Sequence, residues 1–305
     1  MVSESTILGV VYICIITLTA PVHLLIISIL IRKQEFRSLT AYRIMVHMSI
    51  CECSLMVGHF LGGVMSILHV TFRGHLDKIG GCFVNASWIG IVFFTFLLSL
   101  NRLMTFLEIK ISARLERRVF NALLLSVWLM FCAVFAIHLF PEFAIWYDLT
   151  KNGYRFGKGS VAKVNEDIEH NVIFSLLIAE FLLCLATVAT IVLRRNAYST
   201  RFKLSSGELK LFVQSIIIFT YLSVIRCAWH FGQFVQLSDA CIVARDLATQ
   251  AVGLLNPLLY LTFNRLALMH AARIRWSFRS IRKHVLATFR FHDRIFVNVV
   301  VATSK

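Results

Sequence analysis

The chain has 305 residues, of which 58% are hydrophobic, and a formal net charge of +15. A water-soluble domain of this composition would expose more apolar surface than such domains tolerate. The positive charge does not indicate nucleic acid as a partner, because the basic residues are spread over alternate loops instead of being gathered on one surface.

Seven apolar segments, each long enough to cross a bilayer, follow one another along the chain. A hydrocarbon core about 30 Å thick needs about 20 helical residues to span it. Backbone groups inside it must be paired within the segment, which favours helices. The sequence therefore predicts an all-α membrane protein, a seven-transmembrane helix bundle over residues 1–264. The predicted spans are 7–31, 44–70, 82–106, 120–141, 171–193, 209–235 and 243–263.

The distribution of lysine and arginine predicts the orientation of the bundle. These residues are concentrated in the loops after the first, third and fifth spans and after the seventh span. By the positive-inside rule, the N-terminus is extracellular and the C-terminus is cytoplasmic. The first span is too long for a signal-peptide core, so we expect it to stay in place as an anchor. Attraction of the basic loops to anionic lipid follows as a secondary effect.

Residues 265–305 are predicted to form a basic cytoplasmic tail. Apolar residues such as Leu268, Ile274 and Phe278 recur at helical spacing, with arginines largely on the other faces. This pattern predicts a short amphipathic helix on the inner membrane surface. A soluble helix with a solvated charged face is the alternative.

Ionisable side chains inside spans are costly and tend to face the interior of a bundle. Glu180 and Arg226 lie at similar depth below the outer ends of their spans, so we expect them to pair on the floor of an outward-facing ligand cavity. A purely structural ion pair, or two side chains that turn apart, are the alternatives. The other candidates for this cavity lie in the outer parts of the third, sixth and seventh spans: Trp88, Trp229, His230, Gln233 and Asp246.

Two further pairs follow from position along the spans. Glu52 and Asn256 lie at matched depth from the inner side, which predicts a polar contact, although a protonated Glu52 that only packs is the alternative. Cys82 and Cys241 fall near outer helix ends, where oxidation takes place, so a disulfide between them is one hypothesis.

Signatures of enzymes are missing from the sequence. It contains no closely spaced histidine pairs, no phosphate-binding or dinucleotide-binding glycine loop, and no nucleophile elbow. We therefore expect a protein that is not an enzyme and that holds no metal ion or cofactor.

Several motifs resemble those of rhodopsin-like G-protein-coupled receptors. They are Asn101-Arg102 at the end of the third span, Trp128 in the fourth, and Asn256-Pro257-Leu258-Leu259-Tyr260 at the end of the seventh. The segment 41–45 before the second span, together with 100–102, is most similar to nematode serpentine chemoreceptors of classes T and X. The resemblance covers about residues 5–290.

This resemblance implies a sensory receptor in the plasma membrane, with a small-molecule ligand that enters from outside and a heterotrimeric G protein that binds inside. Arg102 matches the arginine that holds the closed state and then meets the G protein. Asn256, Pro257 and Tyr260 match a switch in the seventh helix, in which proline permits a bend, and Glu52 matches an acidic residue that contacts the asparagine.

The chain also departs from the pattern of that superfamily. Asn101 replaces the usual acidic residue before the arginine, and the sequence Cys227-Ala228-Trp229 lacks the proline that normally follows in the sixth helix. The loop after the fourth span has no cysteine for the usual bridge to the third helix. A seven-helix ligand-gated channel or a transporter is the alternative function, although transporters commonly show internal repeats and broken spans that this sequence lacks.

Overall fold

The structure is a computed structural model that describes residues 4–72, 75–109, 111–197, 206–232 and 239–263. The chain divides into two compact units, Met1–Phe263 and Asn264–Lys305. The predicted tail, with its membrane-surface helix, lies outside the described residues.

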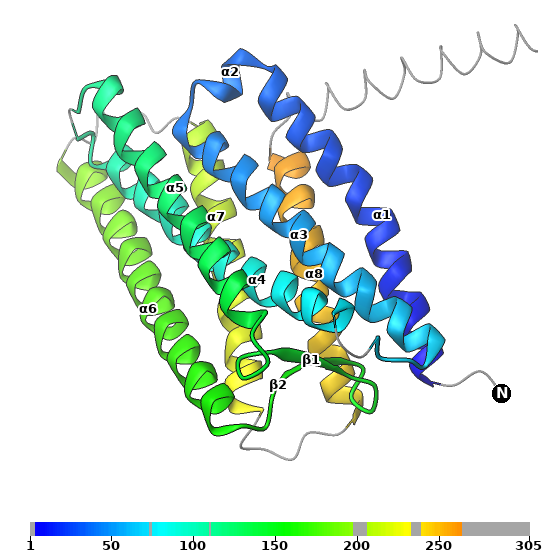
Figure 1. The fold of residues 1–305 in the computed structure, drawn as a ribbon. Helices are drawn as coiled ribbons and strands as arrows, with labels where there is room; N and C mark the ends of the chain where they lie inside the picture. Colours follow the sequence, from blue (N-terminus) through cyan, green and yellow to red (C-terminus); the bar gives the residue numbers. More distant parts are fainter. Residues whose placement is uncertain (1–3, 73–74, 110, 198–205, 233–238, 264–305) are drawn as a thin grey trace, which may run out of the picture. The chain divides into compact units, whose positions relative to one another are not determined.

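The first unit is a bundle of long helices with one short hairpin (Figure 1). The elements, in chain order, are α1 (Glu4–Arg32), α2 (Gln34–Arg37), α3 (Thr40–Leu68), α4 (Leu76–Phe106), α5 (Ala113–His138), β1 (Ile145–Asp148), β2 (Gly153–Phe156), α6 (Ser160–Ala197), α7 (Ser206–Phe231) and α8 (Asp239–Phe263). The hairpin lies at one end of the bundle, beside the start of α1, and we call this the hairpin end. The short helix α2 lies at the opposite end, the α2 end.

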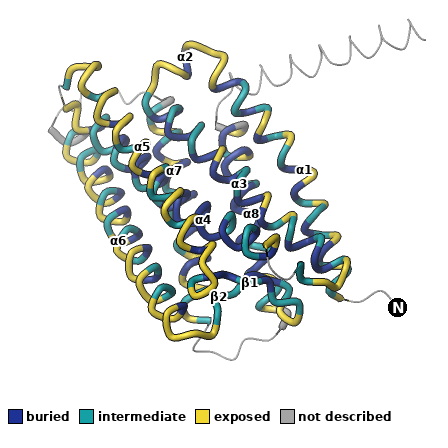
Figure 2. The backbone as a smooth tube through the Cα atoms, in the orientation of Figure 1, coloured by how far each residue is buried: buried dark blue, intermediate teal, exposed yellow. Residues whose placement is uncertain are grey.

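Helix α4 forms the centre of the bundle. It packs against α3, α5, α6, α7 and β1, and its most extensive contact is with α3. Its interior-facing residues include Ala86, Ile91, Phe94 and Leu98, all of which are buried. Figure 2 shows this buried centre, with exposed residues on the outward faces of α5 and α6.

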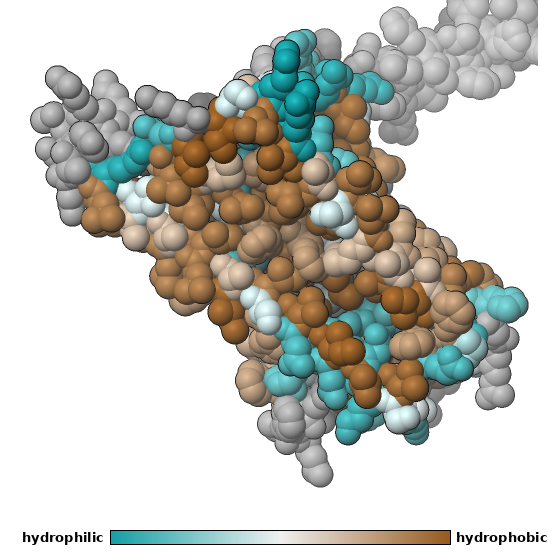
Figure 3. Space-filling view, turned by 60° about the vertical axis from the view of Figure 1, so that its left-hand side comes forward, coloured by the Kyte–Doolittle hydropathy of each residue, from teal (hydrophilic) through white to brown (hydrophobic). Residues whose placement is uncertain are grey.

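The outer faces of the bundle are apolar. Leu125 and Leu129 on α5 and Leu182 and Leu193 on α6 are exposed, although they are large hydrophobic residues. Hydrophobic residues cover the middle of the face in Figure 3, and hydrophilic residues gather toward its ends. A surface of this kind fits a lipid environment. By length and apolar composition, α1, α3, α4, α5, α6 and α7 qualify as membrane spans within the described residues.

Each of the seven predicted spans falls on one long helix, so the predicted architecture is confirmed. Helix α8, with 25 residues, is long enough to span a bilayer, but Arg245, Asp246, Gln250 and Asn256 lower its hydropathy. The predicted ends need small corrections. Helix α3 stops at Leu68, because His69 adopts a left-handed conformation with φ of 52°. Helix α5 stops at His138, before Pro141. Helix α6 begins well before residue 171, since polar residues continue it beyond the apolar segment.

The loop after α5 contains an antiparallel hairpin that the sequence analysis did not predict. Strand β1 pairs with β2 in a register that places Asp148 opposite Gly153. Asn152, just before that glycine, has φ of 49°, a left-handed conformation that asparagine tolerates well. Asn152-Gly153 does not form the two-residue turn that makes Asn-Gly a strong hairpin signal, because Gly153 pairs with Asp148 and four residues, 149–152, connect the strands.

Candidate functional site

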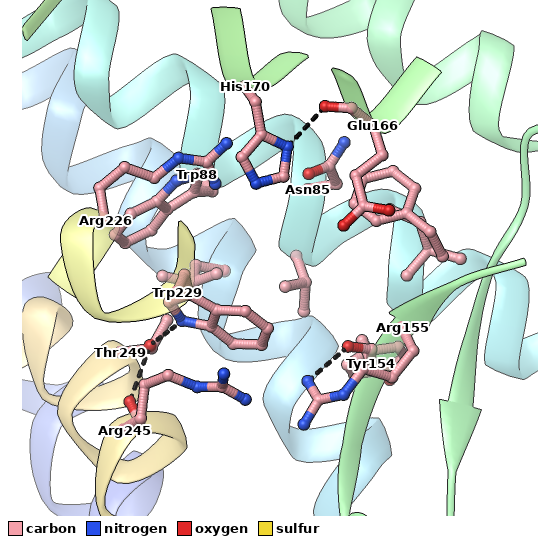
Figure 4. Close-up of a pocket in the computed structure, with 14 residues that line it drawn as sticks. Asn85, Trp88, Tyr154, Arg155, Glu166, His170, Arg226, Trp229, Arg245 and Thr249 are labelled. Carbon is pink, nitrogen blue, oxygen red and sulfur yellow. Dashed lines mark hydrogen bonds between the residues drawn. The ribbon is translucent and has the colours of Figure 1, made fainter. Parts of the chain in front are cut away.

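A cavity of about 400 Å³ lies at the hairpin end, enclosed by α3, α4, α6, α7, α8 and the hairpin. Apolar side chains such as Leu55, Val84 and Ile145 form part of its wall. The rest is aromatic or polar, and Figure 4 shows these side chains converging from several helices on the same space. The polar and aromatic lining residues are Asn85, Trp88, Tyr154, Arg155, Phe156, Glu166, His170, Arg226, Trp229, Arg245 and Thr249.

Trp229 of α7 is held in place by two arginines and a hydrogen bond. The Arg245 guanidinium lies 3.6 Å from the ring centroid and that of Arg155 lies 4.9 Å away. The indole Nε1 donates to Thr249 Oγ1 at 2.9 Å, and Thr249 in turn donates to the Arg245 carbonyl. These contacts fix the orientation of Trp229, so that its ring forms a rigid wall of the cavity.

Asp246 bridges the two arginines beside Trp229 and offsets one of their two positive charges. Its carboxylate lies 3.3 Å from Arg155 of the hairpin and 3.2 Å from Arg245 of α8. The bridge to Arg155 ties the hairpin to α8. Asp246 itself lines a smaller adjoining cavity of about 50 Å³, together with Tyr12, His59 and Tyr147.

Arg226 and Trp88 keep unused hydrogen-bond donors in the main cavity. Both are more than nine-tenths buried, with relative exposures of 9% and 7%. Within the described residues, Arg226 Nε and Trp88 Nε1 have no hydrogen-bond partner. Glu169 and Glu166 of α6 are the carboxylates that act electrostatically on Arg226. Glu169 is engaged elsewhere, because it accepts from Asn85 at 2.7 Å.

The hairpin closes the cavity and is fastened by two tyrosines. Tyr154 donates to the Gly58 carbonyl of α3 at 2.9 Å, and the Tyr147 hydroxyl lies 2.6 Å from Ser66 Oγ. Burial raises the pKa of Tyr147 to about 12 and that of Tyr154 well above its ordinary value, so both phenols remain protonated. Ser5 of α1 donates to Asn152 Oδ1 at 2.5 Å, which adds a third attachment.

A cluster of three buried polar side chains connects α1, α3 and α8 in the middle of the bundle. Asn256 donates to Glu52 Oε1, while Glu52 Oε2 lies 3.6 Å from His23 Nδ1. His23 also contacts the Gly253 carbonyl through its other ring nitrogen. All three side chains are buried.

The ends of α4 and α8 carry a second cluster near the α2 end. Arg102 is buried and donates to Asn101 Oδ1 at 2.7 Å. Glu208, at the start of α7, acts on it electrostatically. Tyr260 packs edge-on against Tyr42 at 6.1 Å between ring centroids, and against Phe36 of α2 at 6.3 Å.

Comparison with known proteins identifies the family. Residues 2–284 match the family described as serpentine type 7TM GPCR chemoreceptor Srt. The chain belongs to this family. The serpentine receptor also resembles a solved structure, squid rhodopsin, with a TM-score of 0.72 and 14% sequence identity over 90% of this chain and 86% of that one. At this identity the likeness shows the seven-helix fold. No curated protein matches the sequence.

In the serpentine receptor, Trp88, Arg226 and Trp229 line the main cavity, as expected, and Asp246 lines the adjoining one. His230 is beside the cavity, where it packs against the rings of His170 at 5.3 Å and Phe174 at 4.9 Å. Gln233 lies outside the described residues.

The expected pair between Glu180 and Arg226 is wrong. Glu180 accepts hydrogen bonds from Thr95 at 3.2 Å and Ser99 at 2.9 Å, both on α4. The two residues lie at different depths, because Phe181 beside Glu180 packs against Phe219 of α7, about two helical turns before Arg226, whereas Arg226 lies near Glu166 and Glu169 at the cavity. Glu180 is therefore not among the residues that line it.

The expected contact between Glu52 and Asn256 is present. The disulfide hypothesis is not supported: Cys82 and Cys241, both within the described residues, are not joined. Cys82 is completely buried on α4, whereas Cys241 is exposed on α8, so the two side chains face different surroundings.

Sequence analysis missed the contribution of the hairpin and of α6 to the cavity. Tyr154, Arg155, Glu166 and His170 all fall between the predicted spans 120–141 and 171–193, for which no structure was predicted. Arg245 falls within the predicted span 243–263, but it was not among the expected cavity residues. A search for aromatic and basic residues near a hairpin turn would have found Tyr154 and Arg155.

Proposed function

We propose that this serpentine receptor binds a small organic molecule in the 400 Å³ cavity and, in response, activates a heterotrimeric G protein at the α2 end. The arrangement of α7 carries the proposal. This helix contributes Arg226 and Trp229 to the cavity, and its opposite end brings Glu208 and Phe212 to α4 beside Arg102. Phe212 packs against Phe106, with 5.6 Å between ring centroids.

A ligand that binds more tightly to one position of α7 shifts the receptor toward that position. Movement of α7 at the cavity then changes the surroundings of Arg102, because one rigid helix spans both regions. Arg102 is the residue that we assign to contact with the G protein. The balance between the two positions of α7 is proposed to depend on five further residues: Asn101, Glu52, Asn256, Pro257 and Tyr260.

The cavity also indicates the chemistry of the ligand. The unpartnered N–H groups of Arg226 and Trp88 favour a molecule that offers hydrogen-bond acceptors. The faces of Trp88 and Trp229 favour a flat or apolar body. A small molecule of mixed character, with an apolar part and an oxygen-bearing group, meets both requirements.

The test is heterologous expression of the full chain with a panel of such molecules and a readout of G-protein nucleotide exchange. Once an activating molecule is found, Arg102→Ala should abolish exchange while ligand binding persists. Trp229→Ala should weaken binding by about tenfold or more, because it removes a cavity wall and its hydrogen bond to Thr249.

Trp128→Phe serves as the control, because the Trp128 indole donates its hydrogen bond to His47 and does not line the cavity. Surface expression should be similar for all variants. A full response from Arg102→Ala would overturn its assigned role, and unchanged binding by Trp229→Ala would place the ligand elsewhere.

A further inference from the structure

A second cavity, of about 530 Å³, lies at the α2 end, on the opposite side of the bundle from the ligand cavity. Four arginines from four helices line it: Arg32 at the end of α1, Arg37 at the end of α2, Arg43 on α3 and Arg117 on α5. Ser38 and Asn121 add polar groups. Four guanidinium groups around one space form a strong local attraction for anions.

Contacts between α3 and α5 position Arg43 at this cavity. Arg43 crosses from α3 to donate to Asn121 Oδ1 on α5. Thr40 joins the same two helices by donating to Glu116 Oε1 at 2.7 Å. Arg43 and Arg117 also repel each other electrostatically. This arrangement keeps like charges close together, which an anionic ligand would relieve.

Carboxylates contribute little to the wall of this cavity. Among the described side chains that line it, none is acidic. Glu116 is the nearby acidic residue on α5; it accepts a hydrogen bond from Thr40, and its charge offsets part of the charge of Arg43. The side chain of Glu35, in α2, lies outside the described residues.

An apolar cavity adjoins the basic one. It has a volume of about 90 Å³ and is lined by Leu30, Val46 and Tyr42, and it shares Ile31, Arg37 and Arg43 with its basic neighbour. A ligand that occupies both spaces must therefore carry an anionic group beside a hydrocarbon part. Membrane lipids with phosphate headgroups have this combination, and guanidinium groups bind phosphate through paired hydrogen bonds.

We propose that these two cavities bind an anionic membrane lipid, with a polyphosphorylated inositol headgroup among the four arginines. A headgroup with several phosphates neutralises several arginines at once, which a headgroup with one net charge does not. The site lies where the polar ends of the helices meet the lipid headgroups, on the side that the basic loops assign to the cytoplasm.

The test uses the full chain purified in a neutral detergent, with native mass spectrometry to count bound short-chain phosphatidylinositol bisphosphate. Arg37→Gln with Arg117→Gln removes two charges from the cavity. Arg114→Gln with Arg118→Gln removes two charges that lie near Arg117 on α5 but do not line the cavity; all four replaced side chains are exposed. The double variant at Arg37 and Arg117 should bind the lipid about tenfold more weakly, as expected for lost phosphate contacts. The control variant at Arg114 and Arg118 should lose less than about twofold.

Equal losses in the two pairs would overturn the proposal, because diffuse attraction to positive charge would then explain the binding. Phosphatidylserine that binds as well as the inositol lipid would overturn the headgroup assignment. Free inositol trisphosphate that binds as tightly as the lipid would overturn the lipid assignment. Arg37→Lys with Arg117→Lys should bind at an intermediate level if guanidinium geometry matters, and melting temperatures show whether every variant is folded.

This experiment needs neither an activating molecule nor a G protein. Its failure would leave the proposed receptor function unaffected, and failure of the signalling experiment would leave the lipid site unaffected.

Discussion

Glu180 and Arg226 are buried ionisable side chains that find separate partners. Helix rise converts residue number into depth only when the helix ends are known. Helix α6 begins at Ser160, well before the apolar segment, and α7 ends at Phe231, so the sequence misplaced both reference points. Glu180 therefore lies about two helical turns deeper than Arg226, beside hydroxyl groups of α4. The Glu52–Asn256 contact was predictable because both helices turn those residues into the interior.

Double-mutant cycles should separate the contact that exists from the one that does not. Glu52→Gln combined with Asn256→Ala should change the melting temperature by less than the sum of the single changes, because the partners are in direct contact. Glu180→Gln combined with Arg226→Gln should give additive shifts. Thermal melting in detergent measures both cycles.

The coupling expected for a contacting pair is about 0.5–3 kcal/mol, which is large enough to resolve. Additive shifts for Glu52 and Asn256 would contradict the buried network. Strong coupling between Glu180 and Arg226 would indicate that they form an ion pair, contrary to the contacts of Glu180 with Thr95 and Ser99.

Among the elements, the hairpin depends on a close approach to α4. A Cβ atom added at Gly81 would collide with the backbone carbonyl of Ile145 in β1. One added at Gly80 would collide with the Tyr154 hydroxyl. These two glycines at the start of α4 let the hairpin lie directly against the helix. The seven helices were predictable because the bilayer imposes their length, whereas the hairpin follows from local turn chemistry that an apolar-segment search ignores.

Gly81→Ala should displace the hairpin and loosen the cavity. Because the collision is with backbone, the neighbour cannot move aside by changing rotamer. We expect a lower melting temperature, by several degrees, and faster release of an activating molecule. A destabilisation of about 1–3 kcal/mol is typical of overpacking.

Gly159→Ala is the matched control, since a Cβ atom there meets no atom within 4 Å. It should leave both the melting temperature and the release rate unchanged. Equal behaviour of the two variants would show that the hairpin does not depend on contact with Gly81.

At the scale of the whole molecule, the orientation of the bundle remains a prediction from the charge distribution. An epitope tag placed before residue 1 should be accessible to antibody on intact cells, and a tag after residue 305 should be accessible only after permeabilisation. The positive-inside rule gives this result because the basic loops stay in the cytoplasm. The reverse pattern would place the 400 Å³ cavity inside the cell and overturn the proposed function.

The family and the seven-helix architecture could be recognised from sequence because both leave strong signals, in apolar periodicity and in the motif from Asn256 to Tyr260. The composition of the cavity could be predicted only in part. Arg155 and Tyr154 reach it from a loop, and the position of a loop depends on contacts with distant helices such as α3 and α8.

Residues 145–156, which cover the cavity, contain no cysteine and are fastened by phenol hydroxyls and an ion bridge. Contacts of this kind do not involve a disulfide, so thiol–disulfide exchange does not break them. A reducing medium therefore leaves these attachments of the hairpin to the helices intact.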